Sequence, residues 1–285
     1  MALERIALIS DVHGNLTAYR AVLADIAARG ITRVFNLGDV VGKGPRGAAC
    51  TALTRERCAA TVRGNWEVFI AGEGEPRSAA QDWWRAELSA DDRAWLRQLP
   101  GSLDLHLSGR LLRLMHASPI DEFTRVHREH SEEQFAMMFA PTPFTGGGRA
   151  ADVVIYGDIH DPFLRSGREG MLANVGSVGN QLDDPTPSYV ILEGDPRGGP
   201  MPRSGSSSCA SPTTSRPRSR RPSPSGCRRP RRTSSNCAPG CTAATTPHSG
   251  SAQRPAQPHG TREVHSSVPN FVSTRSRARE SSSSV

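Results

Sequence analysis

Residues 5–15 read Arg-Ile-Ala-Leu-Ile-Ser-Asp-Val-His-Gly-Asn, an aliphatic run that ends abruptly in polar side chains. The run is typical of a β-strand, and the segment 16–29 that follows has apolar residues at a helical spacing. A second aliphatic run at 31–37 completes a strand–helix–strand unit. This order predicts two parallel strands joined by a right-handed crossover, with Asp11 and His13 directly after the first strand.

Four further polar clusters follow apolar runs in the same way, so each stands where a strand should end. They are Gly38-Asp39, Gly64-Asn65, His116 and Asp158-Ile-His160. In an open α/β sheet the carboxyl ends of the strands line one crevice. We therefore expect seven side chains that are far apart in sequence to meet there: Asp11, His13, Asp39, Asn65, His116, Asp158 and His160.

The remaining pattern predicts a second group of strands. Helices are expected at 46–58, 78–89, 90–99 and 132–139, and strands at 60–63, 103–107, 110–115, 153–156, 163–168, 171–175 and 188–192. Two sheet-forming halves with helices outside them indicate a sandwich of two sheets.

The chain changes character near Asp195. Residues 1–195 carry 20 Lys+Arg against 26 Asp+Glu, a net charge of −6, whereas residues 196–285 carry 15 Arg against 2 Glu, a net charge of +13. The basic balance of the whole chain therefore belongs to the tail and is weak evidence for nucleic-acid binding. We predict one domain at 1–195, which is long enough for a buried core, and a disordered Ser/Pro/Arg-rich tail at 196–285.

The sequence of the tail also indicates translation in the wrong reading frame. GC-rich back-translations of residues 209–215 and 236–247, read in a neighbouring frame, give Val-Arg-Val-Pro-Tyr-Asp-Val and Leu-Arg-Thr-Gly-Val-Tyr-Gly-Gly-Asn-Asp. Our hypothesis is that a frameshift near residues 196–207 replaced the natural C-terminus. An intact Val-Arg-Val-Pro-Tyr-Asp frame downstream in the gene would support the hypothesis, and its absence would refute it.

The sequence favours a cytoplasmic protein. It has no apolar run long enough to cross a membrane, and its first ten residues lack the basic and apolar regions of a signal peptide. Cys50 and Cys58 are the only cysteines before the tail, and we expect buried small residues there instead of a disulfide.

The residue types of the seven expected neighbours point to metal chemistry. Carboxylates, imidazoles and amide oxygens are ligands for hard and borderline divalent metals. A centre with two metals needs one carboxylate that bridges them and further ligands on each side, and it can then hold a hydroxide and a phosphate. Seven donors at one crevice match that requirement.

Five ordered motifs carry a resemblance to a known family. Ile-Ser-Asp11-Val-His13-Gly-Asn, Asn-Leu-Gly-Asp39-Val-Val-Gly, Val-Arg-Gly-Asn65, His116-Ala-Ser-Pro and Gly-Asp158-Ile-His160 resemble those of the calcineurin-like metallophosphoesterases, and most of all the small bacterial phosphodiesterase branch. The resemblance covers residues 1–195. It implies an α/β (α+β) fold with four layers, an αββα sandwich.

The resemblance also implies roles for the site residues. Asp11, His13 and His160 would hold a first metal, Asp39 would bridge, and Asn65, His116 and Asp158 would hold a second metal. Mn²⁺ is favoured, with Fe, Zn, Ni or Co as alternatives. A bridging hydroxide would attack the phosphorus of a small phosphate ester. The residues expected to act directly on it are Asp39, Asn65 and His116 in catalysis, with Arg63 and Asn65 in substrate binding.

Three features depart from the family pattern. The family usually has Gly-His-x-His where this chain has Gly-Asp158-Ile-His160, which would alter the affinity of the second metal site. It often has a His where this chain has Trp66, so a group that helps the leaving group is missing; such a group contributes about 10²–10⁴-fold. This favours diesters or activated esters over phosphomonoesters. Loss of the natural last strand would expose a sheet edge.

Several alternatives stay open. The chain could be a catalytically weak or silent scaffold that binds metal or phosphate, or it could be a phosphomonoesterase or dinucleoside polyphosphate hydrolase. Arg63 could hold a phosphate oxygen or form a structural ion pair. Nucleic-acid binding by the basic tail is a weaker alternative, and the oligomeric state is not indicated. Simpler explanations are preferred for other features: a solvated loop at Lys43 and Arg46, a solvated helix or loop at His127 and His130, and packing at Trp83, Trp84 and Trp95.

Overall fold

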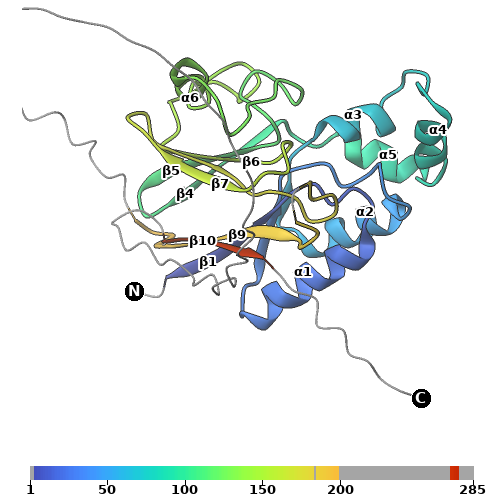
Figure 1. Cartoon of the computed structure of the whole chain (residues 1–285), viewed down its shortest axis with the longest axis horizontal. Helices are drawn as coiled ribbons and strands as arrows, with labels where there is room; N and C mark the ends of the chain where they lie inside the picture. Colours follow the sequence, from blue (N-terminus) through green and yellow to red (C-terminus); the bar gives the residue numbers. More distant parts are fainter. Residues whose placement is uncertain (1–2, 183, 199–269, 276–285) are drawn as a thin grey trace, which may run out of the picture. The chain divides into compact units, whose positions relative to one another are not determined.

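The computed structural model of the chain describes residues 3–182, 184–198 and 270–275, and these residues form two sheets (Figure 1). The first sheet contains, in spatial order, β10 (Asn270–Arg275), β9 (Ser188–Gly194), β1 (Glu4–Ile9), β2 (Arg33–Asn36) and β3 (Ala60–Thr61). The second contains β4 (Ser102–Leu107), β5 (Arg110–Met115), β6 (Val153–Tyr156), β8 (Met171–Asn174) and β7 (Phe163–Ser166).

The first sheet is built on the strand–helix–strand pattern of the N-terminal sequence. β1, β2 and β3 are parallel, and they are connected by α1 (Leu16–Ala28) and α2 (Gly47–Arg57). The Asn15 side chain caps α1 by accepting a hydrogen bond from the Ala18 backbone N–H. The βαβαβ prediction is confirmed. The loops after these parallel strands consequently open at the same end of the sheet.

The outer edge of the first sheet contains a segment of the tail. β9 pairs antiparallel with β1, and residues 270–275 pair antiparallel with β9. The prediction that all of 196–285 is disordered is therefore wrong for this segment, and the sheet edge that we expected to be exposed is paired. Without this segment the edge of β9 would present unpaired backbone groups, and the sequence Asn-Phe-Val-Ser-Thr-Arg contains Phe, Val and Thr, which favour strands. The frameshift hypothesis and the rest of the tail prediction lie outside the described residues.

The second sheet begins with the expected hairpin. β4 and β5 are antiparallel, and the turn residues Ser108 and Gly109 have positive φ angles of 52° and 72°, as a type I′ turn requires. β6 and β8 continue the sheet in parallel, and β7 pairs antiparallel with β8 at the edge.

Three clusters of buried apolar side chains define four layers. One cluster packs α1 and α2 against the first sheet, a second lies between the sheets, and a third packs α6 (Glu132–Met137) and its neighbouring loops on the second sheet. β1 shows the alternation directly, because Ile6 and Leu8 face the other sheet while Ala7 and Ile9 face the helices. Figure 1 shows α1 and α2 beside the first sheet and α6 beside the second. The predicted αββα sandwich is confirmed.

Three short helices pack against one another beside α2: α3 (Asn65–Ala71), α4 (Ala79–Ala86) and α5 (Ala90–Arg97). Ser78 and Ser89 cap α4 and α5 through their side chains, as their positions before apolar segments indicate. α3 was not predicted. It has only seven residues, and it begins at Asn65, which the sequence placed only at the end of the strand expected at 60–63.

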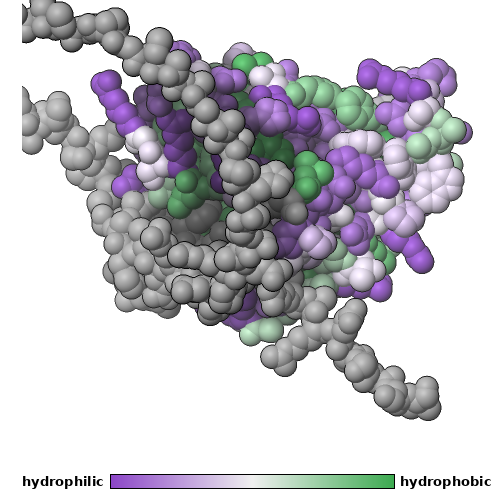
Figure 2. Space-filling model, viewed as in Figure 1, coloured by the Kyte–Doolittle hydropathy of each residue, from purple (hydrophilic) through white to green (hydrophobic). Residues whose placement is uncertain are grey.

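On the parts of the described surface that are visible in Figure 2, hydrophilic and hydrophobic residues are interspersed. The exposed large apolar side chains come from separate loops and elements: Leu3, Trp83, Ile120, Phe123, Leu164 and Leu182. Among the described helices, none has the length and apolar character needed to cross a bilayer. Cys50 is buried and Cys58 half-buried, and both are free, as expected.

Candidate metal centre

The seven predicted ligands lie in loops that directly follow strands of both sheets. Asp11 and His13 follow β1, Asp39 follows β2, and His116 follows β5. Asn65 begins α3 just after β3, and Asp158 and His160 follow β6. All seven side chains are buried. Since buried polar groups need partners, this concentration points to a bound ligand.

Asp11, His13 and His160 form a first group of donor atoms. His160 Nε2 lies 3.1 Å from Asp11 Oδ1 and 3.3 Å from His13 Nε2. His13 Nε2 lies 3.6 Å from Asp11 Oδ1. The three ligand atoms are all within 4.8 Å of one another, which is close enough to surround one metal ion.

Asp11, Asp39 and His116 form a second group with the same spread. His116 Nε2 lies 3.4 Å from Asp39 Oδ1, and Asp39 Oδ2 lies 3.6 Å from His13 Nε2 in the first group. Asp39 therefore directs one oxygen toward each group, and Asp11 belongs to both. A carboxylate in such a position is suited to bridging two ions.

The backbone holds the donors in an uncommon conformation. Asp11, His13, Asp39, Asp158 and His160 have φ angles of 56°, 49°, 57°, 65° and 57°, in the left-handed region that residues with a Cβ rarely occupy. Such strain costs on the order of 1–3 kcal/mol per residue, and it clusters at functional sites. Five of the seven predicted ligands have this left-handed conformation, so directing these side chains inward reduces the stability of the fold.

Several buried atoms of the cluster have no hydrogen-bond partner among the described residues. They are Asp11 Oδ1, His13 Nδ1 and His116 Nε2. His116 Nδ1 donates to the Leu37 carbonyl over 2.8 Å, and His160 Nδ1 donates to the Asn180 carbonyl. These bonds leave Nε2 of both rings facing the cluster, which is how a protein orients metal-binding histidines. The donor set and its unpartnered atoms fit divalent metal ions.

Mutual attraction between carboxylates and imidazoles shifts the pKa values of this centre. Burial alone would raise the pKa of Asp11, but His160 and His13 hold it well below its usual value. Burial alone would lower the pKa of His116, but Asp39, Asp11 and Asp158 hold it well above its usual value. The same balance raises the pKa of His160 beside Asp11. The metal-free cluster thus stores protons that a metal ion would displace.

Glu67 of α3 supports the cluster from behind and was not predicted. Its buried carboxylate accepts backbone hydrogen bonds from Asp39 and Val40, both over 2.8 Å, and from Gly64 over 2.7 Å. Burial and the nearby Asp39 charge raise the pKa of Glu67 to about 7. A Cβ on Gly64 would lie 2.3 Å from Asp39 Oδ1, so only glycine permits this close approach.

Asp158 and Asn65 lie beside His116, outside both donor groups. Asn65 Nδ2 donates to Asp158 Oδ1 over 2.9 Å, and His116 Nε2 is 3.7 Å from the same oxygen. Arg125, from the loop after β5, donates to both Asp158 oxygens over 2.7 Å. Sequence reasoning missed Arg125 because its partner is 33 residues away and no motif contains it.

Lys43 and Trp66 flank the first group. Lys43 Nζ lies 3.0 Å from His13 Nε2 and 5.4 Å from the centre of the Trp66 ring. Lys43 has a positive φ of 59°, and burial of its ammonium group lowers its pKa. Lys43 as a whole is an exposed residue, as expected for a solvated loop charge, and its ammonium group is directed at the cluster. The Trp66 ring lies edge-on to His13 and Trp84, with ring centres 5.8 Å and 5.4 Å apart.

Arg63 forms an ion pair at the rim. Its Nε donates to Glu122 Oε1 over 2.9 Å, and its Nη1 approaches the Arg97 carbonyl at 3.4 Å. Of the two roles left open for Arg63, this geometry corresponds to the structural ion pair. Trp84 and Trp95 pack against the core beside α1 and α2, as expected, while Trp83 is exposed.

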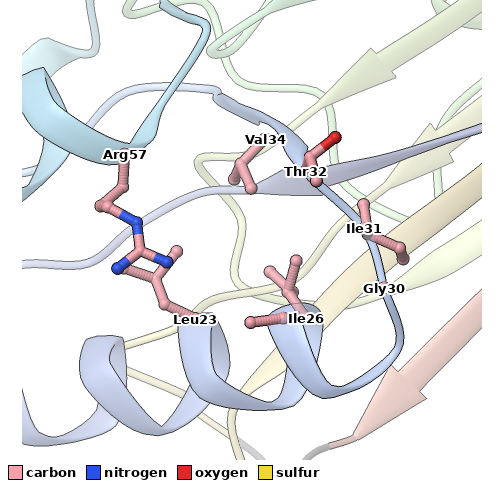
Figure 3. Close-up of a pocket in the computed structure, with 8 residues that line it drawn as sticks. Leu23, Ile26, Gly30, Ile31, Thr32, Val34 and Arg57 are labelled. Carbon is pink, nitrogen blue, oxygen red and sulfur yellow. The ribbon is translucent and has the colours of Figure 1, made fainter.

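A small cavity of about 250 Å³ lies far from this centre along the first sheet. Figure 3 shows its lining from α1, the Gly30–Val34 segment and Arg57. These residues stand at the start of β2, whereas Asp39 follows the end of that strand. The lining contains no carboxylate, so this cavity is not the predicted metal site.

Comparison with known proteins agrees with the geometry. Residues 5–196 match the family model described as the calcineurin-like phosphoesterase superfamily domain. Over 200 residues, 68% of this chain and 76% of the other, the sequence is 30% identical to the protein MJ0912 of Methanocaldococcus jannaschii.

Two solved structures have a similar fold. A metallophosphoesterase from Sphaerobacter thermophilus superposes with a TM-score of 0.55 at 26% identity, over 66% of this chain and 82% of that one. The protein PH1004 from Pyrococcus horikoshii OT3 superposes with a TM-score of 0.54 at 16% identity, over the same shares of the two chains. The family match covers well over half of the chain, and its range is the range in which the seven donors gather. The chain belongs to the calcineurin-like phosphoesterase superfamily, whose members are metal-dependent phosphoesterases.

Proposed function

We propose that the chain is a dinuclear metal-dependent phosphodiesterase that hydrolyses a small phosphate ester in the cytoplasm. The observation that carries the proposal is the pair of donor groups that share Asp11, with Asp39 directed at both. Asp11, His13 and His160 would hold one ion, Asp39 would bridge, and Asn65 and His116 would hold the other. The mixed donors favour Mn²⁺, with Fe, Zn, Ni or Co as alternatives.

The ions, when bound, lower the pKa of water and neutralise charge on a phosphoryl group. The chain's own residues supply orientation. Asp39 is fixed by the Trp66 backbone N–H, which donates to its Oδ1 over 2.9 Å, and by the Glu67 carboxylate behind its backbone. Lys43 places a cation beside His13, where it would attract the negatively charged ester. We assign the catalytic role to Asp39, Asn65 and His116.

Preference for a diester follows from what stands beside the cluster. Trp66 occupies the position where the family often has a His, and an indole cannot protonate a departing alkoxide. A leaving group of low basicity, such as one with an aryl substituent, does not need that proton. We therefore expect aryl diesters to be cleaved faster than phosphomonoesters of poor leaving groups.

One alternative rests on a specific observation. Asp158 stands where the family has a His, and both of its oxygens are held by Arg125. A second ion could then bind weakly, which would leave a metal-binding scaffold with little or no activity. Under this alternative, Asp158→His should create activity; if it only weakens an already active enzyme, the scaffold is rejected.

The deciding experiment is reconstitution of the full chain with Mn²⁺. Bound metal is counted by elemental analysis, and rates are compared on bis(p-nitrophenyl) phosphate and p-nitrophenyl phosphate. We expect two ions per chain and diester hydrolysis that disappears with chelator. Full metal loading without turnover on either ester would reject the phosphodiesterase.

A further inference from the structure

Asp158 differs from the other predicted ligands in the state of its oxygens. Oδ2 accepts a hydrogen bond from Arg125 Nε, and Oδ1 accepts from Arg125 Nη2, both over 2.7 Å. Oδ1 also accepts from Asn65 Nδ2 over 2.9 Å. This is the bidentate fork in which a guanidinium and a carboxylate bind most strongly. By contrast, Asp11 Oδ1 and His116 Nε2 are buried without any hydrogen-bond partner among the described residues.

The burial of the two partners is unequal. The side chain of Asp158 is 1% exposed, whereas that of Arg125 is 49% exposed. A carboxylate that is almost fully buried is costly without a counter-charge, and Arg125 supplies one. The ion pair therefore holds the half-exposed Arg125 side chain against Asp158, a residue that follows β6 and has a positive φ angle.

The remaining nitrogen of Arg125 is available for a ligand. Nε and Nη2 are used on Asp158, and Nη1 makes no hydrogen bond to any described residue. Arg125 is close enough to the centre to be attracted by Asp11 and Asp39 as well as by Asp158, and to repel Lys43. Two cations from separate loops thus border the same cluster, and a guanidinium N–H matches a phosphate oxygen.

We propose that Asp158 is a positioning residue for Arg125 and not a metal ligand, and that Arg125 Nη1 binds a non-bridging oxygen of the phosphate ester. The inference rests on the proposed function in so far as the site takes a phosphate ester. It replaces the role that the sequence predicted for Asp158. It also explains how an aspartate is accommodated at position 158, because the Asp158 carboxylate is neutralised by the Arg125 guanidinium.

The test compares five variants of the full chain: Asp158→Asn, Arg125→Gln, Arg125→Lys, the double variant of Asp158→Asn with Arg125→Gln, and Arg128→Gln as a matched control. Arg128 makes the same kind of fork with Asp161, but on an exposed surface, where the two side chains are 45% and 41% exposed. After Mn²⁺ reconstitution, bound metal is counted by elemental analysis, and binding of inorganic phosphate is measured by calorimetry. KM and kcat on the aryl diester are measured separately.

We expect Asp158→Asn and Arg125→Gln to keep the metal content of the native chain. Each should raise the phosphate dissociation constant and KM by roughly tenfold or more, the scale of one charge-assisted hydrogen bond, with a smaller change in kcat. The double variant should be no worse than either single variant, since both remove the same contact. Arg128→Gln should leave phosphate affinity unchanged, and Arg125→Lys should restore part of it.

Loss of one metal equivalent in Asp158→Asn, with normal metal content in Arg125→Gln, would overturn the proposal and return Asp158 to the ligand set. Unchanged phosphate affinity in Arg125→Gln would overturn it as well. Failure of the proposed function gives a different result, because the native chain would then show no turnover while its phosphate affinity still depended on Arg125.

Discussion

The two halves of the metal centre are built from similar loops, but the carboxylates Asp11 and Asp158 are left in opposite states. Around Asp11, His13 and His160, close donor atoms face one another and Asp11 Oδ1 is unpartnered. Around Asp158, the carboxylate is already satisfied by Arg125 and Asn65. Strand-end geometry therefore brings side chains together without deciding what each one binds. What each side chain binds depends on whether residues of neighbouring loops already form hydrogen bonds with its polar atoms.

The contrast also separates general from particular features of this chain. The first half contains the residues that match the family motifs without exception. The second half contains the departure at Asp158 together with Arg125, which no motif includes. We infer that the first half supports the shared metal chemistry and that, within the second half, Asp158 and Arg125 adjust substrate binding.

Removing the residue that joins the halves should have the largest effect. In Asp39→Ala, His13 and His116 each lose the carboxylate oxygen near their Nε2. We expect diesterase activity to fall by at least about 10²–10³-fold, the scale of losing one main electrostatic stabiliser. Bound Mn²⁺, counted by elemental analysis, should fall in parallel. Retention of both ions with full activity would contradict the role of Asp39 in joining the two donor groups.

The metal-free protein should become less stable as pH rises. The pKa of Glu67 is raised to about 7, and the pKa of His116 is held well above 6.5. The folded chain therefore binds protons that the unfolded chain releases. Their stabilisation is complete below pH 4.5 for Glu67 and below pH 6.5 for His116, and it is lost as pH rises through the folded values.

Urea unfolding in the presence of chelator checks this sign. We expect a lower free energy of unfolding at about pH 8 than at about pH 5.5, with Glu67 contributing roughly 2 kcal/mol of this difference. Glu67→Gln should remove the part of the decrease in the free energy of unfolding that occurs below about pH 7. Asp11 acts in the opposite sense only in acid, since its lowered pKa affects stability below 3.8. A stability that increases over this range would contradict the prediction.

Substitution of Trp66 should sharpen the difference between ester classes. Trp66→His places an imidazole beside His13, where it could protonate a leaving oxygen. We expect the ratio of monoesterase to diesterase rates to rise by about tenfold. Trp66→Phe is the matched control, because it also reduces packing against Phe69 and Trp84 but adds no acid. An equal change of the ratio in both variants would show that ring size, and not proton transfer, governs the preference.

Sequence reasoning succeeded where one local pattern determines one local structure. An aliphatic run followed by a polar cluster placed Asp11, Asp39, His116 and His160 at strand ends, and alternation along the strands placed the layers. It failed where a partner is distant. Arg125 meets Asp158 only after folding, and Glu67 becomes recognisable only when α3 lies behind Asp39. The strand at 270–275 was missed because the Ser/Pro/Arg-rich average composition of the tail masks a short segment that contains Phe271, Val272 and Thr274.

The smallest effect on activity is expected at Arg63, on the rim beside Asn65. Its Nε donates to the buried Glu122 over 2.9 Å and its Nη1 approaches the Arg97 carbonyl, so these two donors are already used. Arg63→Gln should lower the free energy of unfolding by about 1–3 kcal/mol, because Glu122 loses a charged partner. KM on the aryl diester should stay within about twofold. Glu122→Gln breaks the same pair while leaving the guanidinium in place, and it should have a similar effect on urea unfolding. If KM rises strongly in Arg63→Gln alone, Arg63 contacts the substrate, and both arginines beside the second half bind phosphate.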